Sequence, residues 1–281
     1  MVKFLFLICC FAFAAHAQSA LPAPDTPPSS STGASTTAAE DPSAAKARAA
    51  LNAMIEALGG ERWLNLENSY TEGRIAAFYQ GKPTGETILY WDWRTPIVER
   101  IDLTEKKHDK HDWIQIFSGN QCWEITYRGK HTIASDQCGA AIRRRDHSVD
   151  AAVRVWMKQP STILMYDGQS LAARHLAEQV TLLNAENDAI TIQMDAQTHL
   201  PLRCSWSWRD PVYHDKDQDV EEYDDYHNIE GLPTPFTISR FHNGDETQQR
   251  FVMKADYNVP LPMDWFDVDA AAARYEKKKQ E

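Results

Sequence analysis

Beyond its first 17 residues, the 281-residue sequence contains no long apolar run. A helix that spans a bilayer needs roughly 20 apolar residues, so we expect no membrane-spanning helix. The apolar run at residues 4–14 is shorter, follows the positive charge of Lys3 and precedes the small residues Ala15 and Ala17. This pattern is typical of a secretory signal peptide. We expect cleavage near Ala17 and a periplasmic location; a buried N-terminal helix or strand is the alternative.

Basic residues are outnumbered, because Lys and Arg total 29 whereas Asp and Glu total 40. Residues 1–17 hold one Lys and no acid, so their removal takes the formal net charge from −11 to −12. A chain with this charge repels phosphate backbones and anionic membrane surfaces. We therefore expect no nucleic-acid partner.

Cysteine is scarce, and only three remain after the expected cleavage: Cys122, Cys138 and Cys204. A lipid-modified start at Cys10 is disfavoured, because Cys9 rather than Gly, Ala or Ser precedes it. An odd number of cysteines in an oxidising compartment leaves at least one thiol unpaired. The favoured bridge is Cys122–Cys138, and the alternative is three isolated thiols that behave as small apolar residues.

Catalytic motifs are absent too. The sequence contains no Gly-x-Ser-x-Gly elbow, no P-loop and no Gly-x-Gly-x-x-Gly. His108 and His111 lie beside two aspartates, but three lysines in the same turn would repel a metal cation. We read this segment as a solvated loop. The sequence predicts no catalytic residues, no metal and no cofactor, so we do not expect an enzyme.

The chain divides into four parts. Residues 18–40 are rich in Pro, Ser, Thr and Ala and read as a disordered linker between the signal peptide at 1–17 and a single domain at 41–269. Residues 270–281 form a charged helical tail. The domain opens with a helix that Asp41 and Pro42 begin. Its apolar face comprises Leu51, Met54, Ile55 and Leu58, and Gly59-Gly60 ends it.

Alternating apolar and polar residues then predict a long series of strands joined by short turns. The expected strands are 68–80, 86–94, 96–104, 112–118, 121–128, 162–173, 178–184, 188–195, 201–209, 218–228, 234–243 and 246–257. A second helix is expected at about 140–158, ended by Pro160. The predicted fold is α+β: an antiparallel sheet of about 10–12 strands with helices on one face. A sheet this long must curl or close to protect its edges.

Large apolar side chains share faces within these strands, because successive side chains point to opposite sides. A curved sheet with such faces could enclose an apolar hollow for a ligand, or it could simply hold an aromatic-rich packed core. The candidate lining residues are Leu89, Trp91, Trp93, Trp123, Ile125, Tyr127, Ile190, Ile192, Trp206 and Trp208, with Val153, Trp156 and Met157 from the second helix.

Four segments, in order along the chain, resemble the LolA/LolB-like superfamily of periplasmic outer membrane lipoprotein-sorting proteins, which are lipoprotein carriers. They are Ser118-Gly119-Asn120 before Cys122-Trp123, the stretch 192–203 with Asp195 and Leu200-Pro201-Leu202-Arg203, the stretch 222–235 with Tyr223, Tyr226 and Gly231-Leu232-Pro233, and Tyr257-Asn258-Val259-Pro260-Leu261 before Phe266. The likeness covers about residues 44–268. It implies an incomplete, curved antiparallel β-barrel whose helices cover the open, concave side and whose hollow holds acyl chains.

Three polar features bear on that resemblance. The family's carriers have an arginine just before a proline that helps to hold the lid shut. Arg94 matches it but stands one residue further from Pro96, and a solvated turn is the alternative. Arg143 and Arg144, in a run of three arginines, could bind a lipid head group or lie on a solvated face. The acidic stretch 210–225 reads as an exposed loop or, alternatively, as a docking surface for a basic partner.

Together these observations predict a monomeric carrier of lipid or lipoprotein acyl chains between membranes, served by membrane-bound donor and acceptor proteins. The alternative is an envelope sensor or structural module that uses the same fold to bind a protein partner without transport. The linker at 18–40 would suit such an attached module, because a free carrier has no obvious need for it.

Overall fold

The computed structural model describes residues 41–105, 112–210 and 212–280. The expected signal peptide and linker, and the histidines at 108 and 111, therefore lie outside the described residues. All of the described residues belong to one folded unit. No helix among them has both the length and the apolar character needed to cross a membrane.

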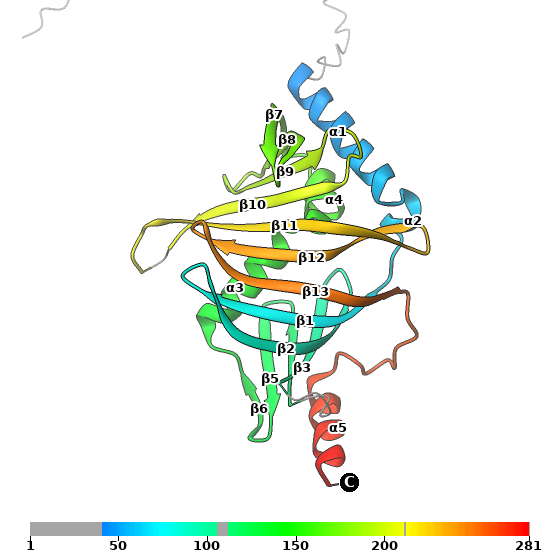
Figure 1. Ribbon diagram of the computed structural model, residues 1–281, viewed down its shortest axis with the longest axis vertical. Coiled ribbons are helices and arrows are strands. Elements are labelled where there is room, and N and C mark those ends of the chain that lie inside the picture. The colour runs from blue at the N-terminus through cyan, green and yellow to red at the C-terminus, as the bar shows by residue number, and fades with distance from the viewer. Residues whose placement is uncertain (1–40, 106–111, 211, 281) are drawn as a thin grey trace, which may run out of the picture. The chain divides into compact units, whose positions relative to one another are not determined.

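One antiparallel sheet dominates the fold, and it contains thirteen strands within the described residues (Figure 1). The strands are β1 (Ser69–Tyr79), β2 (Lys82–Arg94), β3 (Val98–Thr104), β4 (Trp113–Ser118), β5 (Gln121–Thr126), β6 (Gly129–Thr132), β7 (Ile163–Ala172), β8 (His175–Leu183), β9 (Ala189–Asp195), β10 (Pro201–Arg209), β11 (Lys216–Ile229), β12 (Leu232–His242) and β13 (Asp245–Tyr257). Their spatial order is β6-β5-β4-β3-β2-β1-β13-β12-β11-β10-β9-β8-β7. The expected α+β antiparallel architecture is confirmed, with short β6 as the one strand beyond the twelve expected.

The sheet curls without closing, since β6 and β7 stand at opposite ends of the strand order. Its central pair, β1 and β13, carries a register shift at Glu72/Gly73. A β-bulge of this kind bends a strand and increases its twist. A Cβ atom on Gly73 would lie 2.0 Å from the carbonyl oxygen of Phe251, so only glycine permits this close approach of the strands.

Helix α1 (Pro42–Leu58) forms as the sequence predicts. The Asp41 side chain caps its first turn by accepting a hydrogen bond from the Ser43 backbone N–H, and Gly59 ends it with φ 122°. Helix α1 packs on β7 and β8, with its buried face pressed against their inward side chains. The short helix α2 (Glu61–Leu64) follows.

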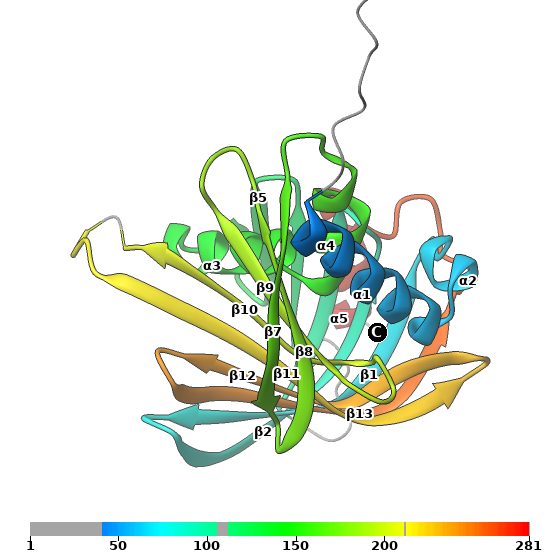
Figure 2. The same cartoon turned by 90° about the horizontal axis from the view of Figure 1, so that it is seen from above.

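The single helix expected at 140–158 is instead three pieces: α3 (Ser135–Asp146), α4 (Val149–Arg154) and the 3₁₀ turn Trp156–Lys158. The break at His147 has a local cause. The Ser148 side chain accepts a hydrogen bond from the Ala151 backbone N–H and so begins α4 as an N-cap, which serine strongly favours. Figure 2 shows the sheet curling around α1, α3 and α4.

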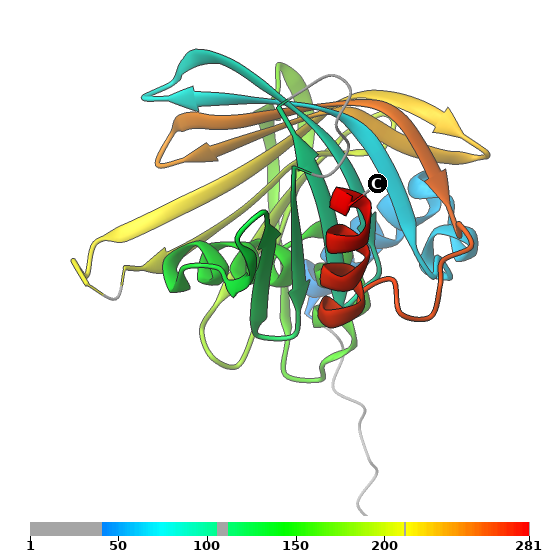
Figure 3. The same ribbon diagram turned by 90° about the horizontal axis from the view of Figure 1, so that it is seen from below.

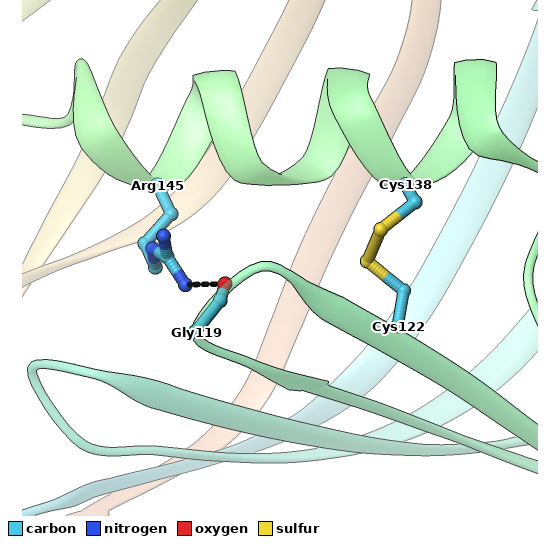
Figure 4. Close-up of a disulfide and its surroundings, with 4 residues drawn as sticks. All are labelled: Gly119, Cys122, Cys138 and Arg145. Atoms are coloured by element: carbon cyan, nitrogen blue, oxygen red, sulfur yellow. Dashed lines mark hydrogen bonds between the residues drawn. A yellow bond between two sulfur atoms is a disulfide. The ribbon is translucent and has the colours of Figure 1, made fainter.

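Two contacts fasten α3 to the hairpin of β4 and β5 (Figure 4). A disulfide joins Cys122 of β5 to Cys138 of α3, as expected, with their Cα atoms 5.6 Å apart. Arg145 Nη1 donates a hydrogen bond of 2.8 Å to the carbonyl oxygen of Gly119. The third cysteine, Cys204, is free and buried. These links place α3 on the Cys122 face of β5.

Helix α5 (Val268–Gln280) covers the other face of the same strands (Figure 3, red helix). Its fully buried Ala271 packs with Ile114, Ile116 and Ile125, whose side chains alternate with that of Cys122. The Tyr275 hydroxyl donates to the carbonyl oxygen of Asp112 at 3.0 Å. The described part of the charged tail expected at 270–281, up to residue 280, thus belongs to a helix that packs on the sheet.

Candidate functional site: a cavity with tyrosine walls and an ionic floor

The concave face of the sheet has two different halves. Over β7–β10, the side chains of α1 and α4 fill the space and form the main apolar core. Leu51 and Met54 of α1 are fully buried there. Five of the predicted lining residues belong to this packed core: Val153, Trp156, Ile190, Ile192 and Trp206. Met157 and Trp208 pack at its margin.

Five of the six remaining predicted lining residues lie on the outer face of the sheet, and Tyr127 lies in the turn between β5 and β6. Tyr90, Asp92 and Arg94 of β2 line the cavity described below, so the alternate residues Leu89, Trp91 and Trp93 face the other way. Trp123, Ile125 and Tyr127 likewise line no part of that cavity. Strand alternation identifies which residues share a face, but a shift of one residue reverses which face points inward.

Trp93 has an aromatic neighbourhood of its own. Its ring meets that of Trp265 edge-on at a centroid distance of 5.0 Å, and the Arg100 guanidinium lies 4.0 Å from the Trp265 ring centroid. Arg100 also forms a buried ion pair with Asp102 at 2.8 Å. The segment before α5 therefore covers aromatic residues that sequence alternation alone had assigned to the hollow.

A cavity opens under the other half of the concave face, between the sheet and the helices. It has two adjacent lobes of about 270 Å³ and about 600 Å³, which share lining residues. We call the smaller one the tyrosine lobe and the larger one the arginine lobe. Residues that line both lobes include Arg94, Ser148, Arg154, Glu221 and Arg240.

Four tyrosines, Tyr90, Tyr223, Tyr226 and Tyr257, form much of the tyrosine lobe, with Leu58, Trp63, Ile238 and Val252 between them. Their hydroxyls form hydrogen bonds with protein groups. That of Tyr223 donates to Glu221 at 3.1 Å, that of Tyr226 donates to the Pro201 carbonyl at 2.7 Å, and that of Tyr257 lies 2.6 Å from the Thr234 hydroxyl. Burial raises the pKa of Tyr223 and Tyr226. The rings therefore remain neutral and serve mainly as an apolar wall.

The floor between the lobes is a network of ion pairs from β2, β3, β11, β12 and β13. Arg94 Nη2 lies 2.6 Å from Glu99, Arg250 Nη1 lies 2.8 Å from Asp92, and Arg240 Nε lies 2.8 Å from Glu221. Arg144 of α3 approaches the same Glu221 oxygen at 3.9 Å. The network, called the ionic floor below, thus joins four arginines to three carboxylates.

Burial and neighbouring charges shift the pKa values of the side chains in the ionic floor. Burial acts to raise the pKa of Glu99, but Arg94 and Arg250 outweigh it and lower that pKa to about 2. Burial also raises the pKa of Asp92 despite its arginine neighbours. Burial, reinforced by repulsion from Arg144 and Arg250, lowers the pKa of Arg240 to about 9. Arg240 therefore lies close to other arginines as well as to Glu221.

Arg154 was not singled out from the sequence. It holds in place the helical cover of the cavity, that is, helices α2 and α4. Its Nε donates to Asp150 at 2.6 Å, its Nη2 donates to the Trp63 carbonyl at 2.7 Å, and its Nη1 donates to the Leu64 carbonyl. It therefore ties α4 to the end of α2. Its spacing of four residues from Asp150 is the one sequence signal for it.

The arginines that the sequence did single out have different positions. Arg94 bonds to Glu99 and Asp92 of the sheet, not to the helical cover. Arg143 stacks its guanidinium 3.9 Å from the Trp208 ring centroid and lines neither lobe. Arg144 lines the arginine lobe. The acidic stretch 210–225 mostly belongs to β11, whose Glu221 is part of the ionic floor.

Comparison with known proteins identifies the fold. No protein-family model and no curated protein matches the sequence. A DUF1329 family protein from Desulfovibrio piger is similar in structure, with a TM-score of 0.54 and 12% identity over 80% of this chain and 98% of that one. A putative outer membrane lipoprotein-sorting protein domain from Vibrio parahaemolyticus has a TM-score of 0.52 and 8% identity over the same shares. The chain therefore has a LolA/LolB-like fold, as its motifs predicted.

Proposed function

We propose that this protein is a non-enzymatic periplasmic binding protein that holds acyl chains of a lipid or lipoprotein and carries them between membranes. The tyrosine lobe is the observation that carries the proposal, because its rings and aliphatic side chains form an apolar wall beneath the helical cover. The signal-peptide pattern at residues 1–17 and the LolA/LolB-like fold support it.

The ionic floor suits a carrier that must release its ligand. Each acyl methylene that leaves water stabilises the complex by about 0.8 kcal/mol, so a fully apolar cavity would hold a long chain too tightly. Buried charges beside the tyrosines reduce the apolar area that a chain can cover. Arg154 fastens the cover through hydrogen bonds to two backbone carbonyls, which can break and re-form when a ligand passes.

Membrane-bound donor and acceptor proteins would deliver and receive the ligand. A second candidate function is an envelope sensor or structural module that binds a protein partner without transport. One observation favours it: β7 ends the sheet, and apolar Ile163, Leu171 and Leu176 are exposed on the β7–β8 hairpin. A partner's extended segment could add to such an edge.

A cavity-filling pair of variants tests the carrier proposal. Val252 and Met253 are neighbours on β13, but Val252 lines the tyrosine lobe and is 8% exposed, whereas Met253 is 60% exposed on the outer face. Native mass spectrometry of the purified protein should show bound acyl species in the wild type and in Met253→Trp, and a loss of most of them in Val252→Trp. A wild-type protein without acyl species that also fails to bind a fluorescent fatty acid would contradict the proposal.

A further inference from the structure

We infer that the ionic floor binds the anionic head group, a carboxylate or a phosphate, of an amphiphile whose acyl chain occupies the tyrosine lobe. This inference rests on the proposed function and deepens it by naming the ligand's chemical class. It assigns a binding role to Arg144, Arg240 and Arg94.

Charge balance is the first argument. Within the ionic floor, four arginines, Arg94, Arg144, Arg240 and Arg250, pair with three carboxylates, Asp92, Glu99 and Glu221. The chain as a whole has a formal net charge of −11. Other acidic residues line the arginine lobe, but Asp146, Asp150 and Asp188 pair with Arg145, Arg154 and His147, so the surplus of guanidinium groups is local to the ionic floor. One negative charge on a ligand would complete the balance.

Unused donors are the second argument. Within the described residues Arg144 makes no hydrogen bond, since its nearest partner, Glu221, is 3.9 Å away. Arg94 bonds to its carboxylate partners through Nη2, and 45% of its side-chain surface is exposed beside the cavity. Arg250 is only 7% exposed, yet its Nε has no partner among the described residues. Guanidinium groups with free N–H donors match the two-oxygen geometry of carboxylate and phosphate groups.

Position is the third argument. Arg94 and Arg240 line both lobes, and Arg250 lines the tyrosine lobe. A head group bound to Arg94 and Arg240 therefore lies where the two lobes join. From there the attached chain would extend into the tyrosine lobe, which Tyr223 and Val252 line. The ionic part of the cavity thus matches the head group of an amphiphile, and the apolar part matches its acyl chain.

The experiment compares three probes on the delipidated full chain by isothermal titration calorimetry: laurate, dodecanol and acetate. We expect laurate to bind about tenfold or more tightly than dodecanol, because charge-assisted hydrogen bonds stabilise the charged head group. Raising the salt concentration should weaken laurate binding and leave dodecanol binding unchanged. Acetate, which lacks the chain, should bind too weakly to measure.

Arg144→Gln is the test variant, because Arg144 makes no hydrogen bond to the described residues that the fold would lose. It should remove most of the preference for laurate while dodecanol binds as before. Arg203→Gln is the matched control, since Arg203 forms a 2.6 Å ion pair with Glu222, the neighbour of Glu221, but lines neither lobe. It should bind all three probes like the wild type, and thermal melts establish that both variants are folded.

The outcomes separate the two proposals. Equal affinity for laurate and dodecanol, or an Arg144→Gln variant with an unchanged preference, would overturn the head-group inference and leave acyl binding standing. Failure of both long-chain probes to bind would overturn the proposed function and, with it, this inference. Acetate that binds as tightly as laurate would show an anion site without an acyl chain, which also overturns it.

Discussion

The two halves of the concave face belong to one continuous sheet but are stabilised in different ways. Over β7–β10, α1 and α4 press directly on inward side chains such as Ile192, and the space is filled. Over β1, β2 and β11–β13, the inward positions carry tyrosines and ion pairs such as Arg250–Asp92, and a cavity remains. The same backbone pattern therefore supports either a core or a binding site, and the inward side chains decide which.

The two halves also differ in what they contribute to stability and to function. Apolar burial is the main favourable term in folding and is greatest in the packed half. Buried ion pairs contribute little net stability, because desolvation offsets their attraction. The cavity half can therefore devote its polar groups to a ligand while the packed half, α5 and the Cys122–Cys138 bridge hold the fold.

Breaking the ionic floor should produce the largest effect. Arg250→Met leaves the buried Asp92 carboxylate without its 2.8 Å partner. We expect a loss of about 4 kcal/mol in the free energy of unfolding at pH 7, measured by urea denaturation. The double variant Asp92→Leu/Arg250→Met should recover most of that loss. If Arg250→Met alone is as stable as the wild type, the buried Asp92 carboxylate does not depend on Arg250 as its partner.

Truncating one isoleucine in each half should cause different losses in the free energy of unfolding. Ile192 is fully buried in the packed core, and Ile192→Ala should cost about 3 kcal/mol through lost burial and a new cavity. Ile238 borders an existing cavity, so Ile238→Ala should cost less than about 1.5 kcal/mol. Urea denaturation of both variants measures the difference. Equal losses would mean that the two halves are packed alike.

Acid should act on the cavity half through Glu99, with a smaller effect. The folded pKa of Glu99 is lowered from 4.5 to about 2, so its stabilisation is present above pH 4.5 and is lost as pH falls toward 2. We expect a loss on the order of 2 kcal/mol over this range. Asp92 acts in the opposite direction, because its pKa is raised and its protonation relieves an unfavourable buried charge.

Glu99→Gln, followed by urea denaturation at several pH values, isolates this contribution. Its stability should depend less steeply on pH between 4.5 and 2 than that of the wild type. Glu222→Gln is the matched control, because Glu222 pairs with Arg203 away from the cavity. A Glu99→Gln profile parallel to the wild-type profile would contradict the assignment.

Much of the fold could be predicted from local signals. Asp41, Pro42 and Gly59 mark the ends of α1, and turn residues separate nearly every strand. The disulfide partner of Cys122 was also favoured correctly. The break between α3 and α4 was missed, because the helix was predicted from the apolar spacing of Val149, Ala152 and Val153, which all lie after the break, and a single side chain, Ser148, starts the new helix.

The candidate site was less predictable. Arg94 and Arg144 were named and do line the cavity, but the thirteen proposed apolar lining residues do not, apart from Trp156. The tyrosines at 90, 223, 226 and 257 and the arginines at 154, 240 and 250 were not proposed as lining residues. Some of their partners are distant in sequence, as with Arg250 and Asp92, which are 158 positions apart. No local pattern could connect them.

The sequence by itself determined the alternation of the strands, the ends of α1, the acidic net charge, and the order along the chain of the strands that form an antiparallel sheet. Only the tertiary structure decided which face of each strand points inward, which half of the concavity α1 fills, and that α5 covers the outer face of β4 and β5. The reason is physical. A period of two looks the same from either side of a sheet, so the choice between Tyr90 and Trp91 depends on helices and loops far away in the chain.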